Sequence, residues 1–274
     1  MKKALSVLLL LGGLVPARAE LLVTDVVGVA ELEGRGPVKT LDPVGDGGRL
    51  AIPAGGRVTA VDLATGREYL LGPGKYAVQP SGPRSADGKP VEARALPAQN
   101  LPPVRIAAAR AGQATLVMRS LRKANIPVPL APVRAATLTD TPEFRWAGVE
   151  GAGAYRLTLS RREGGLLWEA TVREVQAALP ADRRLAAGEH YVWRVEALGE
   201  GAVISDASAG FWVAPAEAME RLNALRPGPD APFARRVLYA AQLREAGVRD
   251  AAREEWKRLV RERPDDPVLK ELAE

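Results

Sequence analysis

Residues 142–160 read PEFRWAGVEGAGAYRLTLS, and residues 185–197 read LAAGEHYVWRVEA. Within the first stretch, Tyr155, Leu157 and Leu159 alternate with polar residues. Alternation of apolar and polar residues with a period of two predicts β-strands that bury one face. Glycine-rich turns separate the strands, and this spacing is typical of an antiparallel sandwich. We therefore expect a β-sandwich over residues 140–214.

Most aromatic residues of the chain belong to this region. The chain has thirteen aromatic residues, and eight of them lie within Pro142–Val213. The alternation predicts that Trp146, Tyr155, Tyr191 and Trp193 share one interior. The alternation does not require Trp168 and Trp212 to lie in that interior, so they are candidates for an exposed binding surface. The full set is Phe144, Trp146, Tyr155, Trp168, Tyr191, Trp193, Phe211 and Trp212.

The two quoted stretches resemble the fibronectin type III fold. In that comparison Trp146 is the core tryptophan, and Tyr155 opens the next strand. Leu185 and Tyr191, with Gly188 between them, resemble the tyrosine corner of the family, although Ala187 stands where a proline is usual. The resemblance implies that the Tyr191 hydroxyl forms a hydrogen bond with a backbone group a few residues earlier in the chain.

A smaller β module is expected over residues 20–80. Short β-rich segments alternate with turns that contain glycine, which predicts a small barrel or curled sheet and gives no helical period. The order of these segments resembles the FecR-type periplasmic β domain, with Gly66, Tyr69 and Gly72 at the hairpin positions. The expected segments are Val23–Leu32, Arg49–Ile52, Arg57–Leu63, Arg67–Leu71 and Lys75–Val78.

Residues 81–139 are rich in proline and predict a linker. The stretch Ala107–Ala124 fits either a helix or a strand, and its pattern does not decide between them. Residues 94–139 contain no acidic residue. Arg119, Arg122 and Lys123 are therefore a candidate basic surface for an anionic envelope polymer, although a solvated linker accounts for the same charges more simply.

Residues 215–274 change to helical periodicity. We expect helices over Ala216–Leu225, Phe233–Ala246 and Arg249–Glu262, and a short one that begins at Pro267. Small and aromatic residues in the middle pair resemble one tetratricopeptide repeat, which cannot bury its face alone. The tail must then pack on this chain or on a partner. The residues that carry the resemblance are Ala240, Leu243, Gly247, Ala252, Trp256, Leu259 and Pro264.

Residues 1–19 read as a cleavable secretory signal peptide. Lys2 and Lys3 precede an apolar run of about a dozen residues, and a small-x-small motif ends at Ala19. The run is short for a membrane span, which needs roughly twenty residues. Removal of this segment takes away three cations and no acid, so the formal charge falls from +5 to +2. That value argues against a nucleic-acid partner.

The chain offers few groups for catalysis. It contains no cysteine, so it has no disulfides and no lipoprotein attachment site. His190 is the one histidine, and strand alternation turns it away from the predicted interior. No nucleophile elbow or phosphate-binding motif occurs. We expect no catalytic residue, no metal ligand and no cofactor.

These observations predict a mainly β, multidomain protein that is not an enzyme. It combines a small barrel or curled sheet, a fibronectin-like sandwich and an α-helical C-terminal tail. The export signal places it in the periplasm or outside the cell, without a membrane span. The expected function is protein–protein interaction or scaffolding with an unidentified envelope protein. The alternative is a carbohydrate- or peptidoglycan-binding protein that uses Trp168 and Trp212.

Overall fold

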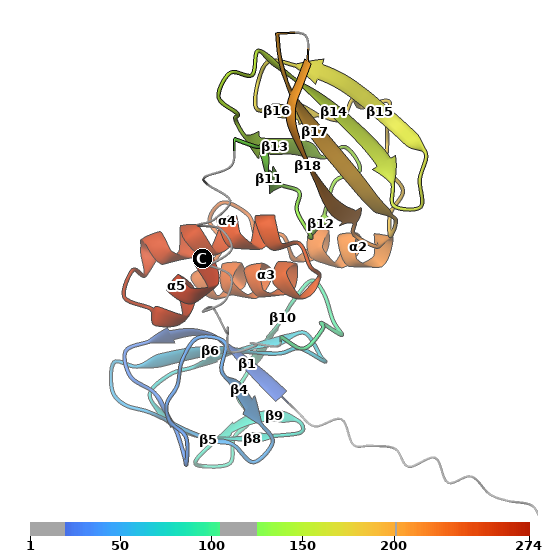
Figure 1. Cartoon of the computed structure of the whole chain (residues 1–274). Coiled ribbons are helices and arrows are strands. Elements are labelled where there is room, and N and C mark those ends of the chain that lie inside the picture. The colour runs from blue at the N-terminus through green and yellow to red at the C-terminus, as the bar shows by residue number, and fades with distance from the viewer. Residues whose placement is uncertain (1–19, 105–124, 201) are drawn as a thin grey trace, which may run out of the picture.

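The computed structural model describes residues 20–104, 125–200 and 202–274. The expected signal peptide, the stretch Ala107–Ala124 and the three cations Arg119, Arg122 and Lys123 lie outside these residues. The chain forms two β modules with a layer of helices between them (Figure 1). The expectation of a mainly β chain with a helical C-terminal region is confirmed.

The first β module consists of two five-stranded sheets. One sheet has the order β10-β7-β6-β1-β4, and the other has the order β3-β2-β5-β8-β9. Val23 on β1 and Ala60 on β6 face the core between the sheets, whereas Leu22 and Val61 face the helices. These strands are therefore apolar on both faces. The strands are β1 (Glu20–Val27), β2 (Glu31–Leu32), β3 (Gly36–Pro37), β4 (Pro43–Gly45), β5 (Arg49–Ile52), β6 (Arg57–Asp62), β7 (Arg67–Leu71), β8 (Gly74–Gln79), β9 (Gly82–Ser85) and β10 (Ala93–Ala95).

This module extends beyond the predicted boundary at residue 80. Strands β9 and β10 belong to its sheets, and Leu96 and Leu101 are buried against the helices. The prolines led to the prediction of a linker here. Pro83 is tolerated because β9 is an edge strand. A residue without an N–H group there removes no hydrogen bond between inner strands of the sheet.

The second β module is the predicted sandwich, and it begins at residue 128, before the expected position 140. A three-stranded sheet, β11-β13-β16, faces a five-stranded sheet, β12-β18-β17-β14-β15. Trp146 and Trp193 are buried in the core between the sheets, as predicted. The strands are β11 (Val128–Ala131), β12 (Ala136–Thr137), β13 (Glu143–Ala147), β14 (Ala154–Arg161), β15 (Leu166–Val172), β16 (Gln176–Ala178), β17 (His190–Gly199) and β18 (Ala202–Val213).

The tyrosine corner is present. The backbone N–H of Ala186 donates a hydrogen bond to the Tyr191 hydroxyl oxygen over 2.8 Å. Tyr191 itself is buried beside Phe211. The bond links the loop before β17 to the strand that enters the core, and it confirms the prediction that this hydroxyl bonds backbone upstream.

The helices follow the predicted pattern closely. They are α2 (Ala216–Leu225), α3 (Phe233–Glu245), α4 (Arg249–Glu262) and α5 (Pro267–Ala273). Trp256 and Leu243 lie in one apolar core with Leu22 and Val61 of the first module and Ala136 of the sandwich. The helical tail therefore docks on its own chain, which decides a point that the sequence left open.

Candidate functional site

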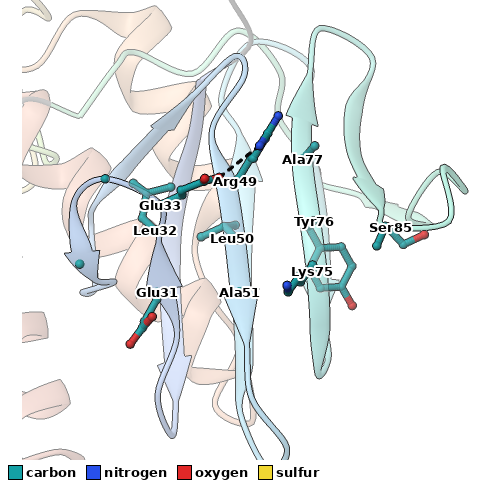
Figure 2. Close-up of a pocket in the computed structure, with 13 residues that line it drawn as sticks. Glu31, Leu32, Glu33, Arg49, Leu50, Ala51, Lys75, Tyr76, Ala77 and Ser85 are labelled. Carbon is teal, nitrogen blue, oxygen red and sulfur yellow. Dashed lines mark hydrogen bonds and ion pairs between the residues drawn. The ribbon is translucent and has the colours of Figure 1, made fainter.

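A shallow groove of about 620 Å³ crosses the outer face of sheet β3-β2-β5-β8-β9 (Figure 2). Strand pairing explains its floor, because Glu31, Ala51 and Lys75 are register partners on β2, β5 and β8. Partners in a register point to the same face of a sheet. Arg49 and Ala77 form a second such pair one row away. Two alanines thus form the floor, and charged side chains surround them.

The charged residues of the groove are distributed over neighbouring strands, and Arg49 lies between Glu33 and Ala77. Glu31 and Glu33 lie at the β2 side, whereas Arg49 and Lys75 lie on β5 and β8. Arg49 and Glu33 form an ion pair with an N–O distance of 3.5 Å, but their side chains are 71% and 66% exposed. Exposed pairs of this kind contribute little to stability. These side chains are therefore available to a partner.

Tyr76 lies between Lys75 and Ala77 on β8, pairs with Leu50 and packs against the core beneath the groove. Its hydroxyl donates a hydrogen bond to the Gly72 carbonyl oxygen over 3.1 Å, which holds the half-buried ring in place. The described residues that line the groove include no histidine. The arrangement offers a flat surface and charges of both signs, which suit an extended partner better than an acid–base reaction.

Sequence reasoning missed this groove. Ala51 and Ala77 point outwards at adjacent positions of β5 and β8, beside exposed charges on neighbouring strands. The spacing of small and charged residues along Arg49–Ile52 and Lys75–Val78 was visible in the sequence. What was not visible was the pairing of β5 with β8 across twenty residues, which brings the two alanines together.

The structure separates the two candidate tryptophans. Trp168 pairs in register with Leu159, so its ring faces the sandwich interior and stacks on Phe144 with centroids 6.1 Å apart. Trp212 pairs with His190 and lies on the opposite face of the same sheet. Both rings are half-buried. They do not form one platform of adjacent exposed rings.

Trp212 belongs to the contact between sandwich and helices. The Ala136 N–H donates to the Gly247 carbonyl oxygen over 2.8 Å. A methyl group on the Gly247 Cα would lie 2.9 Å from the Cζ2 atom of Trp212. Trp212 is thus packed against the turn between α3 and α4. His190, beside it, is exposed, as its position in the alternation predicted.

Ion pairs between β1 or β7 and the helices fix the first module to the helical layer. Arg235 of α3 makes a two-pronged contact with Glu68, with distances of 2.9 and 3.3 Å, and both side chains are largely buried. Arg263, just after α4, bonds Asp25 and lies 4.0 Å above the Phe233 ring. These contacts attach the sheet that contains β1 and β7 to the helices.

Metal sites and membrane spans need side chains and helices of particular kinds. Across residues 20–104, 125–200 and 202–274, no group of three or more His, Asp or Glu side chains could hold a metal ion. In the same part of the chain, no helix combines the length and the apolar character needed to cross a bilayer.

The fold defines a mainly β, multidomain protein with a fibronectin type III-like sandwich. A scan against protein-family models found no match, and a search of curated proteins found none. Among solved structures, the crystal structure of FN3tt is 15% identical over 32% of this chain and 87% of that chain, with a TM-score of 0.24. The fn3 domain of human collagen alpha-1(XX) chain is 20% identical over 32% and 85%, with a TM-score of 0.27.

CopC from Methylosinus trichosporium OB3b is also similar to part of the chain. It is 20% identical over 33% of this chain and 95% of that chain, with a TM-score of 0.24. Each of these three similarities covers about a third of this chain. They do not extend to a function, which has to be inferred from the groove and from the contacts between the modules.

Proposed function

We propose that this chain is a non-enzymatic protein of the cell envelope that binds another protein through the groove on its first module. The observation that carries the proposal is the groove itself. In one row of its floor, Ala51 lies between the acid Glu31 and the base Lys75. An extended segment with charges in the opposite order could lie across it and pair on both sides.

The helical layer supports a scaffolding role. It shares one apolar core with both β modules and is tied to the first by the Arg235–Glu68 and Arg263–Asp25 pairs. A partner bound in the groove would therefore be held at a set distance from the sandwich. The resemblances to a FecR-like domain and to a tetratricopeptide-like hairpin agree with protein binding, because both imply interaction modules.

The proposed compartment is the periplasm or the exterior, after cleavage of residues 1–19. N-terminal analysis of the protein recovered from the envelope fraction tests this. A mature chain that starts at Glu20 is expected. Recovery of the full-length chain from the cytoplasm would contradict this part of the proposal and leave the groove to be tested separately.

The glycan alternative has less support from the geometry. It calls for exposed, nearly coplanar rings, whereas Trp168 stacks on Phe144 inside the sandwich and Trp212 packs against Gly247. The basic surface Arg119, Arg122 and Lys123 lies outside the described residues. Binding of the mature protein to anionic liposomes at low and high salt remains its test.

Photo-crosslinking tests the groove. A photoreactive amino acid in place of Ala51, on the floor, should give a discrete crosslinked adduct in cells. The same amino acid at the exposed Ala181 of the sandwich is the matched control and should not give that adduct. Lys75→Glu should abolish the adduct, whereas Lys270→Glu on α5 should leave it unchanged. The same adducts from both positions, or none from Ala51, would refute the proposal.

A further inference from the structure

Among the residues that the structure describes, strand β15 has a hydrogen-bonded neighbour on one side alone, so it is an edge of the sandwich. It ends the sheet order β12-β18-β17-β14-β15, and Figure 1 shows it at the outer margin of the upper module. The strand has seven residues, LLWEATV, with Glu169 as the one charge among them. Leu166 at its start is 62% exposed. Proteins usually protect such edges with charges, proline or very short strands, because an unpaired edge can pair with another chain.

A cavity of about 260 Å³ opens beside this edge. Both Leu167 and Trp168 line it. Leu167 falls at the register shift between Leu159 and Ser160 and packs with Trp168 against the sandwich core, so the cavity lies on the inner face of the sheet at its β15 end. Its inner wall is apolar and belongs to the sandwich core, and it includes Leu159, Leu185 and Tyr191.

The outer wall of the cavity is basic. Arg161, Arg183 and Arg184 line it, together with the single acid Asp182. Arg184 forms an ion pair with Asp140 at an N–O distance of 3.0 Å. The N–O distance between Arg183 and Asp182 is 3.9 Å, and both of these side chains are exposed. The Arg161 side chain has no hydrogen bond or ion pair to any residue that the structure describes. Two guanidinium groups are therefore available at this opening.

We propose that β15 binds an extended segment of a partner protein by strand addition. The segment places one apolar side chain in the cavity beside Trp168 and one acidic side chain against Arg161 and Arg183. Main-chain hydrogen bonds to the strand edge supply affinity, and the cavity and arginines supply specificity. This site lies on a different module from the groove, and the proposal stands independently of it.

A second copy of the chain fits this edge less well. An antiparallel pair of β15 strands in full register would be centred on Glu169, so this residue would oppose its own copy. Arg173 of one copy would also lie at the Arg161 end of the other. Like charges directly opposite across strands are destabilising. The charges thus favour an acidic partner over self-association.

The test is selection from a displayed library of random nine-residue peptides on the immobilised mature chain. The variant Ala186→Trp blocks the cavity, because Ala186 is exposed and lines it. Ala187→Trp, one residue on and outside the lining, is the matched control. We expect enriched peptides with alternating apolar residues and at least one acid. They should bind the wild type and Ala187→Trp but not Ala186→Trp.

Two further measurements distinguish strand addition from nonspecific binding. Arg161→Glu should lower the affinity for a selected peptide on the order of tenfold, which corresponds to about 1.4 kcal/mol. Arg162→Glu, at an exposed neighbour that does not line this cavity, should leave it unchanged. The peptide should also slow amide exchange in residues 166–172.

Several results would overturn the proposal. One is that no peptide family binds the wild type and fails to bind Ala186→Trp. The others are enrichment of basic peptides, and a bound peptide that does not slow amide exchange in β15. Concentration-dependent dimers that protect β15 without peptide would show instead that a second copy occupies the edge.

Discussion

Substitution of Gly247 by alanine should destabilise the contact between the sandwich and the helices. Gly247 ends α3 with φ at +78°, a left-handed conformation that costs an L-residue about 1–2 kcal/mol. The added methyl would also lie 2.9 Å from Cζ2 of Trp212, and overpacking of this kind costs about 1–3 kcal/mol. We expect Gly247→Ala to lower the free energy of unfolding by about 2–5 kcal/mol in total.

A matched control separates the two contributions. Gly151 has φ at +82°, but a methyl group there would meet no atom within 4 Å. Gly151→Ala should therefore cost only the backbone strain, about 1–2 kcal/mol. Urea unfolding of each variant, analysed by linear extrapolation, gives the two values.

A double-mutant cycle tests whether Trp212 causes the difference. In a Trp212→Leu background the ring is gone, so Gly247→Ala should lose its extra cost and retain only the backbone strain. If the effect of Gly247→Ala is the same with and without the ring, Trp212 does not pack on this turn. The account of the joint between sandwich and helices would then be refuted.

Three further substitutions test the core, the corner and one ion pair. Trp193→Ala should cost about 3–5 kcal/mol of unfolding free energy, because the ring is fully buried; a loss under about 1 kcal/mol would place it at the surface. Tyr191→Phe should cost about 1–3 kcal/mol by urea unfolding, since the Ala186 N–H loses its acceptor, and an unchanged midpoint would contradict the corner. A hydrogen bond from Arg236 lowers the pKa of Glu262 below its ordinary value of 4.5. This pair therefore stabilises the fold above that pH, and its contribution is lost as the pH falls through the lowered pKa. Glu262→Gln should reduce the loss of stability on acidification, and a wild-type acid profile in the variant would count against the pair.

Much of the sandwich could be read from the sequence because its strands bury one face. Alternation placed Tyr155, Leu157 and Leu159 in the interior, and the structure buries all three. Which residues of β15 face the core could not be predicted in this way. Leu166–Val172 has apolar residues on both faces, and a register shift between Leu159 and Ser160 sets which of them face inwards.

The candidate sites required information that local pattern does not contain. The floor of the groove depends on the pairing of Ala51 with Lys75 and of Arg49 with Ala77 across two strands. The cavity beside Trp168 depends on a loop that returns from the other sheet. Long-range pairing of this kind is set by the whole fold, whereas the sequence shows only which residues are free to take part.

The sequence by itself determined the core strands of the sandwich, the C-terminal helices and the Tyr191 corner. Local periodicity and turn residues suffice for these, because they express the geometry of single strands and helices. Only the tertiary structure decided that the helices dock between the two β modules, that Trp212 packs against Gly247, and that β15 is an edge strand. These features arise where segments far apart in the chain bury apolar surface together, and no single segment carries that information.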